Sequence, residues 1–573
     1  QRRWGRRGTH WAPVSGRAAA PEGRPGLHVG AAEEQCEAIE LLPTDLCSDE
    51  AEGPAAGAAA PAAVAAAAEA LGPGPSAWDL FLRSMDFNAR MVRLLLPYVP
   101  VKVKSALADL QGEVLDPDGP LEAEWHQVHE QGAKAMSALA RDLKGFHVKA
   151  GQTIATRTDL FPKEYSLELA YLVESVNPLP FATVKRIVEA ELLGGLPLED
   201  AFEAFEEQPL GSASIAQVHR ARLRGGRDVA VKVQRPHAEV QLMKDVRDIR
   251  EFSGLARSVF PVDYYTVFTE IERQMQFEFD FCLEAAGMDR VASALGRGGR
   301  RPPVHVPRSV PGLVSRRVLC MDFVPGASLS NLRAELKRRG IDVSPGSRAE
   351  KAFGRRLLQA LSDAFAVMFF EEGFFHADPH PGNVFIMPDL SVALIDFGQT
   401  KQIGYRFRRE LAELVVALSG CGDTEEDFER VAKLLPAMGT QFLDSAHPLC
   451  GLALALWLFD TSRTELPGGY EPNELSPKCP ARDCSTFDPD FVLVCRTTLL
   501  IRGLAARLGV EWSLTKAWRE SALSCLGRAP SEAEAGEAAP GPPPAGGTAG
   551  LVARGKRLWH WAAQRVGGSG EKK

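Results

Sequence analysis

Three residues that can do chemistry, His376, Asp378 and His380, lie within five positions of the stretch GFFHADPHPGNVF (373–385). Two kinds of site could use them. Imidazoles and a carboxylate gathered on one loop could bind a metal ion. Alternatively, the loop could serve phosphoryl transfer, with Asp378 as the base and Asn383 as a metal ligand. The two hypotheses give the chemical roles to different side chains, so the residues around the stretch must decide between them.

The spacing around this stretch matches two motifs of protein kinases. A kinase catalytic loop reads H-R-D-x-x-x-x-N, and His376, Asp378 and Asn383 fit it, with alanine in place of the arginine. Thirteen residues after Asn383, Asp396 stands in IDFG, the motif of a metal-binding kinase aspartate. Asp378 would orient the acceptor or take its proton, while Asn383 and Asp396 would hold Mg²⁺ against the phosphates. We therefore favour phosphoryl transfer and expect His376 and His380 to be structural.

Two upstream segments could supply the nucleotide-binding half of such a site. Lys232 ends the strand-like VAVK, and a kinase uses such a lysine to neutralise the α- and β-phosphates. Before it, GSASIAQV (211–218) resembles the kinase loop G-x-G-x-x-G-x-V, with alanines at the second and third glycines. Small side chains let backbone amides approach phosphate, although alanine blocks positive φ, and a tight hairpin is the alternative. The candidate phosphate-binding residues of this loop are Gly211, Ser212, Ala213, Ser214, Ala216 and Val218.

Hydrophobic patterning predicts the elements that position these segments. AQVHRARL and DVAVKVQ, with a Gly-Gly pair between them, predict a β-hairpin, and RRVLCMDFV (316–324) predicts another strand. Helical spacing dominates elsewhere, as in FATVKRIVEAELLG (181–194) and RRLLQALSDAFAVMFFEE (355–372). VLCMDFVPG lies where a hinge between two kinase lobes belongs. The nucleotide-contacting residues expected there are Met321, Asp322 and Val324.

Composition narrows the class of protein. The net charge of −8 argues against a general nucleic-acid binder, and the ten scattered cysteines favour a reduced compartment. No run of 18 or more strongly apolar residues occurs, and GLALALWLF (451–459) predicts a core helix. The Arg-rich, acid-poor segment 1–30 resembles an organellar transit peptide. A disordered basic tail, or sequence upstream of the true start, is the alternative for this segment.

Six motifs together resemble the UbiB family of atypical kinase-like proteins, also called the aarF-domain or ADCK family. They are KAGQ (149–152), PLGSASIAQVH (209–219), VAVKVQRP (229–236), EFDFCLEA (278–285), GFFHADPHPGN (373–383) and LIDFG (394–398). The resemblance runs from about 125 to 420, and HADPHPGN together with KxGQ is its most specific part.

The resemblance implies an α+β fold: a bilobal protein-kinase-like fold with a helical N-terminal KxGQ extension and a helical C-terminal tail. In the family the extension folds over the active site. The residues on its motif are Lys149, Gly151 and Gln152. The family's E-x-D pair, which contacts the extension, matches Glu278 and Asp280, although both could equally be solvated helix charges. The glutamate that pairs with the strand lysine maps to Glu284.

On this basis we expect six segments. They are a disordered or targeting segment (1–76), the helical KxGQ extension (77–205), the kinase-like N-lobe (206–324), the kinase-like C-lobe core (325–420), the C-terminal helices of the C-lobe (421–527), and a low-complexity linker with a basic amphipathic tail (528–573). The tail helix at 551–566 places an apolar stripe beside arginines, so it could lie on an anionic membrane. A solvated tail is the alternative.

Two departures from ordinary protein kinases argue against phosphorylating proteins in trans. Ala377 removes the arginine that would clamp a phosphorylated activation loop. After DFGQTKQIG the chain enters the helical run RFRRELAELVVAL, and no A-P-E motif follows. The sequence therefore leaves no room for the activation segment on which a peptide substrate would lie.

The leading hypothesis is an atypical kinase or ATPase that binds ATP or ADP with Mg²⁺, with Asp378, Lys232 and Glu284 as catalytic residues. The resemblance implies a role in isoprenoid-quinone (ubiquinone or plastid prenylquinone) or lipid metabolism. It also implies a small-molecule or lipid substrate, quinone-biosynthesis proteins as partners, and a peripheral membrane location in a mitochondrion or chloroplast. Two alternatives stay open: a catalytically quiet pseudokinase scaffold that binds nucleotide and lipid, and a true protein kinase.

Overall fold

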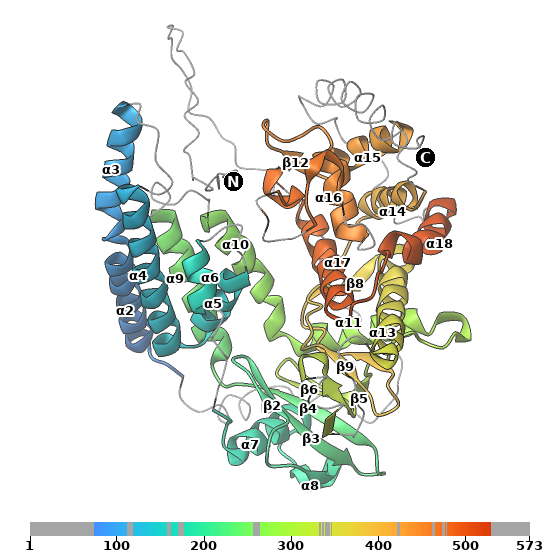
Figure 1. Ribbon diagram of the computed structural model, residues 1–573. Coiled ribbons are helices and arrows are strands. Elements are labelled where there is room, and N and C mark those ends of the chain that lie inside the picture. Colours follow the sequence, from blue (N-terminus) through green and yellow to red (C-terminus); the bar gives the residue numbers. More distant parts are fainter. Residues whose placement is uncertain are drawn as a thin grey trace, which may run out of the picture.

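The computed structural model describes residues 74–111, 119–156, 162–169, 177–255, 264–331, 347–420, 425–460, 465–472, 478–486 and 488–528, with a few single residues between these ranges. The expected targeting segment and the tail helix at 551–566 lie outside the described residues. A helical bundle, an antiparallel sheet and a second helical lobe make up the described part (Figure 1).

The helical bundle begins with α2 (Ala77–Leu95). Ser76 caps this helix: its hydroxyl accepts a hydrogen bond from the backbone N–H of Asp79, whose carboxylate accepts one from Ser76 N–H. This reciprocal capping box satisfies two otherwise unpaired donors. The next helices in the chain are α3 (Tyr98–Gln111), α4 (Pro120–Leu143), α5 (Phe146–Thr156) and α6 (Lys163–Leu169).

Two helices from later in the chain complete the bundle, α9 (Ala238–Leu255) and α10 (Tyr264–Met275). Arg83 of α2 donates to both carboxylate oxygens of Asp245 in α9, at 2.6 and 2.8 Å. Both helices belong to the range 206–324 expected for the N-lobe, so the chain leaves the sheet to reach the bundle and then returns. The amphipathic pattern of a helix cannot specify which of two neighbouring cores it joins.

The sheet has six antiparallel strands in the order β1-β3-β4-β6-β5, with β2 paired to β3. The strands are β1 (Phe202–Phe205), β2 (Gly211–Ser212), β3 (Ala216–Leu223), β4 (Asp228–Gln234), β5 (Ser309–Val314) and β6 (Val318–Asp322). The predicted hairpin and the predicted third strand are confirmed as β3, β4 and β6. β1 comes from residues expected in the helical extension, directly after the short α8 (Leu198–Ala201).

Successive side chains of a strand point to opposite faces, and both faces of this sheet are covered. On one face, Val231 of β4 and Cys320 of β6 pack with α7 (Phe181–Leu192), which confirms that predicted helix. On the other face, Leu319 of β6 packs with α11 (Phe281–Leu295). Lys232 follows Val231 in β4 and therefore points to the side of α11.

The second helical lobe is built around α13 (Arg348–Ala366), which continues as a π-helical turn over Val367–Glu372. The predicted helix at 355–372 is thus present, with a wider last turn that ends at Gly373 in the left-handed conformation. The remaining helices are α14 (Tyr405–Ser419), α15 (Glu425–Ala437), α16 (Cys450–Phe459), α17 (Pro489–Arg507) and α18 (Leu514–Gly527). Short strands are β7 (Ala327–Ser328), β8 (Phe374–His376), β9 (Val384–Ile386), β10 (Val392–Leu394), β11 (Thr400–Gln402), β12 (Gln441–Phe442) and β13 (Cys484–Thr486).

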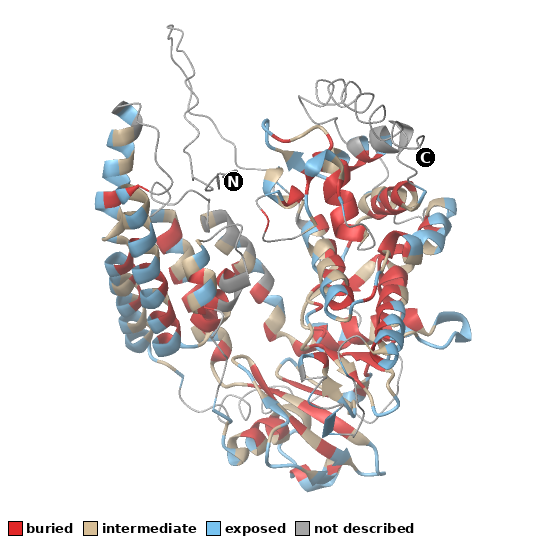
Figure 2. Ribbon diagram, viewed as in Figure 1, coloured by how far each residue is buried: buried red, intermediate tan, exposed pale blue. Residues whose placement is uncertain are grey.

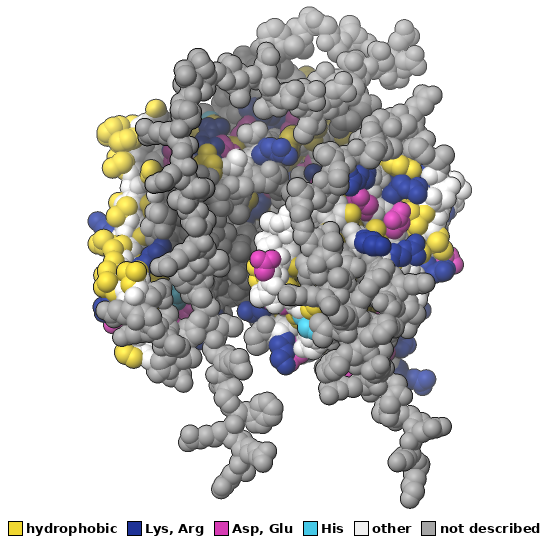
Figure 3. All heavy atoms as spheres, turned by 90° about the horizontal axis from the view of Figure 1, so that it is seen from above, with side chains coloured by type: hydrophobic (Ala, Val, Ile, Leu, Met, Phe, Trp, Pro, Cys, Tyr) yellow, Lys and Arg dark blue, Asp and Glu magenta, His cyan; other side chains and the backbone are white. Residues whose placement is uncertain are grey.

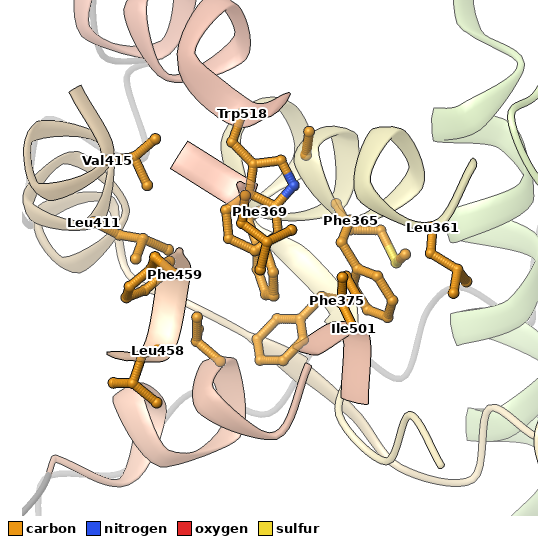
Figure 4. Close-up of a cluster of buried hydrophobic side chains, with 14 of the residues drawn as sticks. Leu361, Phe365, Phe369, Phe375, Leu411, Val415, Leu458, Phe459, Ile501 and Trp518 are labelled. Carbon is orange, nitrogen blue, oxygen red and sulfur yellow. The ribbon is translucent and has the colours of Figure 1, made fainter. Parts of the chain in front are cut away.

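Aromatic residues fill the core of this lobe (Figures 2 and 4). Trp518 is fully buried and lies edge-on to Phe369, with the two ring centroids 5.5 Å apart. Its indole N–H donates a hydrogen bond to the carbonyl of Ser362 at 2.8 Å. The ring of Phe369 in turn packs on that of Phe375, with the centroids 4.7 Å apart, and Phe375 is the residue directly before His376. The core therefore supports the strand that leads into the candidate catalytic loop.

The most apolar helix of the lobe, α16, is buried along nearly its whole length, which confirms the predicted core helix. Within the described ranges, no helix combines the length and the apolarity needed to cross a lipid bilayer.

Candidate active site

Lys232, Glu284 and Asp396 meet where the sheet faces the helical lobe. The ammonium of Lys232 donates to both carboxylate oxygens of Glu284 at 2.8 Å, and to Oδ1 of Asp396 at 3.2 Å. The side chain of Glu284 is 3% exposed and that of Asp396 is 49% exposed. The lysine therefore joins a buried carboxylate to one that solvent can reach.

The first turn of α11 places Glu284. Asp280 caps this helix by accepting a hydrogen bond from Cys282 N–H at 2.9 Å. Phe281, the first helical residue, lies under the ammonium of Lys232, 5.1 Å from its ring centroid. Such a cation–π contact stabilises a desolvated cation. The capped helix end and the aromatic ring thus hold the ion pair in place.

The three charges shift each other's pKa. Burial raises the pKa of Glu284 to about 7, because the nearby Lys232 only partly offsets the loss of water around the carboxylate. Burial also opposes the charge of Lys232, but Asp396 and Glu284 outweigh it and hold the lysine pKa above its ordinary value. The charge of Lys232 holds the pKa of Asp396 well below its usual range. Lys232 and Asp396 are therefore ionised at neutral pH, and Glu284 titrates close to it.

Asp396 has an unusual backbone conformation, with φ of 60°. Non-glycine residues rarely occupy this left-handed region, and aspartate tolerates it better than most. The next residue, Phe397, is buried in the core, and Gly398 N–H donates to Oδ1 of Asp396 at 3.4 Å. Because Phe397 is anchored in the core, the backbone at Asp396 turns its carboxylate toward Lys232. The left-handed conformation of Asp396 is a local strain of the kind that functional sites retain.

The predicted catalytic loop lies between β8 and β9. The side-chain amide nitrogen of Asn383 donates to the carbonyl of Asp378 at 3.2 Å, and the backbone carbonyl of Asn383 accepts from Ile395 N–H at 3.0 Å. Ala377 N–H donates to the carbonyl of Gln399 at 2.9 Å. These bonds bring the loop alongside the segment that carries Asp396, so the residues predicted to hold a metal are on adjoining segments.

The histidines of the loop have framework positions. His376 is fully buried, donates from Nε2 to the carbonyl of Ile395 at 3.1 Å, and lies edge-on to Phe397 at 4.9 Å. Burial lowers the pKa of His376, which keeps the ring neutral. His380 accepts a hydrogen bond from Gly382 N–H within the loop. Among the described residues no group of three or more His, Cys, Asp and Glu could hold a metal ion, so the alternative of a histidine metal site gains no support.

An arginine that the sequence motifs do not reveal lies beside this loop. Arg496 of α17 donates from Nη1 to the carbonyl of Ala377 at 3.4 Å and lies 3.9 Å from Oδ1 of Asp378. Its position partly replaces the arginine that a kinase loop carries at residue 377. No spacing rule could identify it, because 119 residues separate it from Ala377.

The predicted phosphate-binding loop runs from β2 into β3, and its chain reverses where Ala213 N–H donates to the carbonyl of Ala216 at 2.9 Å. Gly211 of β2 and Lys232 of β4 both pair with Val218 of β3, so the loop and the lysine lie on the two sides of the same strand. Arg235, three residues after Lys232, donates to the carbonyl of Ala213 at 2.7 Å and to the hydroxyl of Ser212 at 2.6 Å. The loop therefore has a fixed tip. Ser214 and Val218 are half-buried, whereas Gly211 and Ala213 are exposed.

The expected hinge follows β6. Met321 and Asp322 are the last residues of this strand, and Val324 follows it. The carboxylate of Asp322 accepts a hydrogen bond from the guanidinium of Arg227 at 2.5 Å, so the Asp322 side chain stabilises the sheet. After the hinge, Gly326 approaches the helical lobe closely: a Cβ atom there would lie 2.5 Å from the carbonyl oxygen of Ile386.

The KxGQ segment reaches the site through Lys149. Its ammonium donates to both oxygens of Glu278 at 2.9 Å, and Oε1 of Glu278 also accepts from the side-chain amide of Gln399 at 2.5 Å. Glu278 therefore links α5 to the segment directly after Asp396. Asp280, expected to contact the extension together with Glu278, caps α11 by accepting a hydrogen bond from Cys282 N–H, and its contact with the extension stays a prediction. Gly151 is buried in α5, and the side chain of Gln152 lies outside the described residues.

The segment after Asp396 is short. β11 pairs antiparallel with β8, with Thr400 opposite His376, and α14 begins at Tyr405. The early helix expected from RFRRELAELVVAL is confirmed. These residues return along the strand that leads into the catalytic loop and do not form an extended platform.

Comparison with known proteins identifies related chains. The ABC1 atypical kinase-like domain matches residues 171–434. AarF domain-containing protein kinase 1 of Gallus gallus is 31% identical over 339 residues, which are 58% of this chain and 60% of that protein. An uncharacterized protein of Synechocystis sp. is 30% identical over 306 residues, which are 52% of this chain and 72% of that protein.

A plant relative is similar over a longer stretch. Protein ACTIVITY OF BC1 COMPLEX KINASE 7, chloroplastic, of Arabidopsis thaliana is 30% identical over 381 residues, which are 64% of this chain and 51% of that protein. The chain thus spans between about half and three fifths of the chicken and plant relatives.

Proposed function

Because the chain belongs to the ABC1/AarF family of atypical kinase-like proteins, also called the UbiB or ADCK family, we propose that it binds ATP or ADP with Mg²⁺ and acts as an atypical kinase or ATPase. The observation that carries the proposal is the contact of Lys232 with both Glu284 and Asp396. A phosphate-binding lysine needs a buried carboxylate to hold it and a metal-binding carboxylate beside it.

The residues present fit a hard divalent cation. Asp396 is ionised and half exposed, and the amide nitrogen of Asn383 is bound to Asp378, which leaves the amide oxygen as the available donor. Mg²⁺ usually takes one or two protein oxygens and completes its shell with phosphate and water. Bound between Asn383 and Asp396, the ion would neutralise charge on the phosphates.

The chain's own residues then have distinct tasks. Lys232 pairs with the phosphates, and Glu284 fixes its direction. Asp378 orients the attacking hydroxyl or water and takes its proton, while Arg496 positions the loop that carries it. The loop from Gly211 to Val218 presents backbone N–H groups to the phosphates. Positioning and charge stabilisation of this kind supply most of the catalysis of phosphoryl transfer.

The acceptor is proposed to be a small molecule, a lipid or water. The short β11 segment supports this choice, since it pairs with β8 and α14 follows within three residues of its end. A peptide substrate would need an activation segment on which to lie. A role in isoprenoid-quinone or lipid metabolism, with quinone-biosynthesis proteins as partners, is proposed from the family resemblance. The plant relative named above is chloroplastic, and an organellar, peripheral membrane location is proposed on the same footing.

One experiment tests the proposal in two steps. Thermal unfolding of the full chain should shift upward with Mg–ATP or Mg–ADP, by mass action on the folded state. Nucleotide turnover, measured with and without lipid vesicles or quinone analogues, should fall at least ~100-fold in Asp378→Asn. Asp389→Asn is the matched control, because Asp389 binds Ser391 in an exposed turn between β9 and β10.

The outcomes separate the hypotheses. Absence of any thermal shift with either nucleotide would remove the proposal. Binding without turnover in the wild type would favour the pseudokinase scaffold. Robust phosphorylation of a peptide library would favour a true protein kinase.

A further inference from the structure

Three cysteines gather at one end of the helical lobe, where α16 begins. Cys450 is the first residue of α16, Cys484 is the first residue of β13, and Cys479 directly precedes the short 3-10 helix η7 (Pro480–Asp483). Cys450 and Cys479 are buried, whereas Cys484 is half-buried. Cys450 and Cys484 lie far apart in the chain, so only the folded structure shows that they belong together.

The sulfurs of Cys450 and Cys484 meet at one backbone carbonyl. Sγ of Cys450 lies 3.5 Å from the oxygen of Pro480, and Sγ of Cys484 lies 3.6 Å from the same oxygen. The two thiols also hydrogen-bond to each other, and both are reduced. The pairing of Phe442 in β12 with Cys484 fixes the backbone on the β13 side. An S–S bond, about 2.0 Å long, forms between thiols that are in direct contact of this kind.

The surroundings activate Cys450 more than Cys484. The hydrogen bond from Cys484 lowers the pKa of the Cys450 thiol and outweighs burial, and the nearby Tyr470 hydroxyl acts in the same direction. The same contact, together with burial, raises the pKa of the Cys484 thiol. In addition, the first turn of a helix has unpaired N–H groups and the positive end of the helix dipole, which stabilise a thiolate. Cys450 is therefore the better nucleophile of the pair.

Solvent reaches this pair from the Cys484 side. β12, α15 and α16 lie at the upper end of the helical lobe in Figure 1, and this end faces the viewer in Figure 3, where charged and hydrophobic side chains are interspersed. Because Cys484 is half-buried there, a small oxidant such as a peroxide can reach the thiols. A metal ion is a poorer fit, since within the described ranges no group of three or more His, Cys, Asp and Glu could hold one.

We propose that Cys450 and Cys484 form a reversible redox pair, which hydrogen peroxide converts into a disulfide that ties β13 to the start of α16. The Cys450 thiolate attacks one oxygen of the peroxide, the O–O bond breaks, and the leaving hydroxide takes a proton to become water. The sulfenic acid on Cys450 then reacts with the Cys484 thiol, which forms the S–S bond and releases a second water. Two electrons pass from the two sulfurs to the peroxide, and an added dithiol reduces the disulfide again by thiol exchange.

The disulfide acts on α17, which follows β13 closely in the chain. In the first turn of α17, Asp490 pairs with Lys401 of β11 at 2.9 Å. Farther along the helix, Arg496 donates to the carbonyl of Ala377 in the candidate catalytic loop. A covalent tie at Cys484 restrains the segment that leads into α17, so this end of the helix opens less often. Oxidation of the pair is thereby coupled to the helix that borders the catalytic loop.

The first test maps the disulfide. The full chain, treated in its folded state with hydrogen peroxide and then alkylated, should give a linked Cys450–Cys484 peptide in mass spectrometry, and dithiothreitol should remove the link. Cys495→Ser is the matched control, because Cys495 is half-buried in α17 and its pKa is raised by burial alone. This variant should form the disulfide as the wild type does. Absence of the linked peptide, or a link from Cys484 to Cys479 in its place, would overturn the proposal.

A second measurement detects the intermediate and does not depend on the disulfide. In Cys484→Ser the sulfenic acid on Cys450 lacks its proposed partner, so dimedone, which traps sulfenic acids, should label Cys450 after peroxide treatment. The opposite pattern, with label on Cys484 in Cys450→Ser and none on Cys450 in Cys484→Ser, would contradict the proposed order of attack.

Hydrogen exchange tests the effect on α17. Exchange of residues 489–496 should be slower in the peroxide-treated wild type than in the reduced protein. Peroxide should leave the exchange of these residues unchanged in Cys484→Ser. Equal exchange in the oxidised and reduced wild type would show that the disulfide does not restrain the helix and would overturn this part of the proposal.

Discussion

Arg496 and Asp378 come from distant parts of the chain, yet Nη1 of the arginine lies 3.9 Å from Oδ1 of the aspartate. The same nitrogen donates to the carbonyl of Ala377, the residue that occupies the usual arginine position of a kinase loop. α17 therefore returns a cation to the loop from outside it. Because both side chains are partly exposed, this contact contributes less free energy than a buried ion pair does.

Replacement of Arg496 should weaken nucleotide turnover without abolishing it. A loss of about 1 kcal/mol in positioning corresponds to roughly a fivefold fall in turnover. We expect Arg496→Gln to lower kcat by about that factor with little change in KM, and Arg496→Lys to recover part of it. Steady-state hydrolysis of Mg–ATP measures both constants. Equal rates in the wild type and the Gln variant would show that the contact has no role.

The stability of the protein should depend on pH through Glu284. Its pKa is about 7 in the folded state against an ordinary value of 4.5, so between these pH values the folded state holds a proton that the unfolded state has lost. The free energy of unfolding should therefore fall as pH rises through this window. Glu284→Gln cannot titrate and should show a flatter profile in urea unfolding.

Other groups of the cluster titrate outside that window. Asp396, with its lowered pKa, loses its stabilising effect only as pH falls below about 3.8, and Lys232 loses its effect only at alkaline pH. The slope between pH 4.5 and 7 thus reports on Glu284 within this cluster. Identical slopes in the wild type and in Glu284→Gln would contradict the assignment.

Removal of the Lys149 ammonium should loosen the segment after Asp396. Lys149→Met leaves Glu278, 11% exposed, without its cation, at a cost of about 1–2 kcal/mol for a partly exposed pair. Gln399 shares Glu278, so hydrogen exchange of residues 396–402 should become faster.

A matched control is Lys134→Met, since Lys134 pairs with Glu130 on the surface, with both side chains more than 60% exposed. That variant should change the free energy of unfolding by less than about 0.5 kcal/mol. If the two variants behaved alike, the contact between the KxGQ segment and Glu278 would be incidental.

Truncation of Trp518 should destabilise the helical lobe strongly. Trp518→Ala removes a fully buried indole that touches Phe369 and Phe370, and such changes cost about 3–5 kcal/mol. Leu523→Ala, in the same helix but 40% exposed, should cost much less. Chemical denaturation of both variants gives the comparison, and similar losses would mean that α18 does not support the core as inferred.

The sequence alone predicted the local strands and helices, and its motifs named the candidate site residues. Period-two alternation in AQVHRARL and DVAVKVQ specified β3 and β4 to the residue, and the interval from Asn383 to Asp396 identified both candidate metal ligands. These features are readable because they depend on neighbours within one strand or loop.

Only the tertiary structure decided how distant segments combine. The places of α9 and α10 in the bundle, of Arg496 beside Asp378, and of Glu278 between Lys149 and Gln399 depend on contacts across more than 100 residues or on a choice between two cores. Periodicity records that a face is apolar but not what covers it.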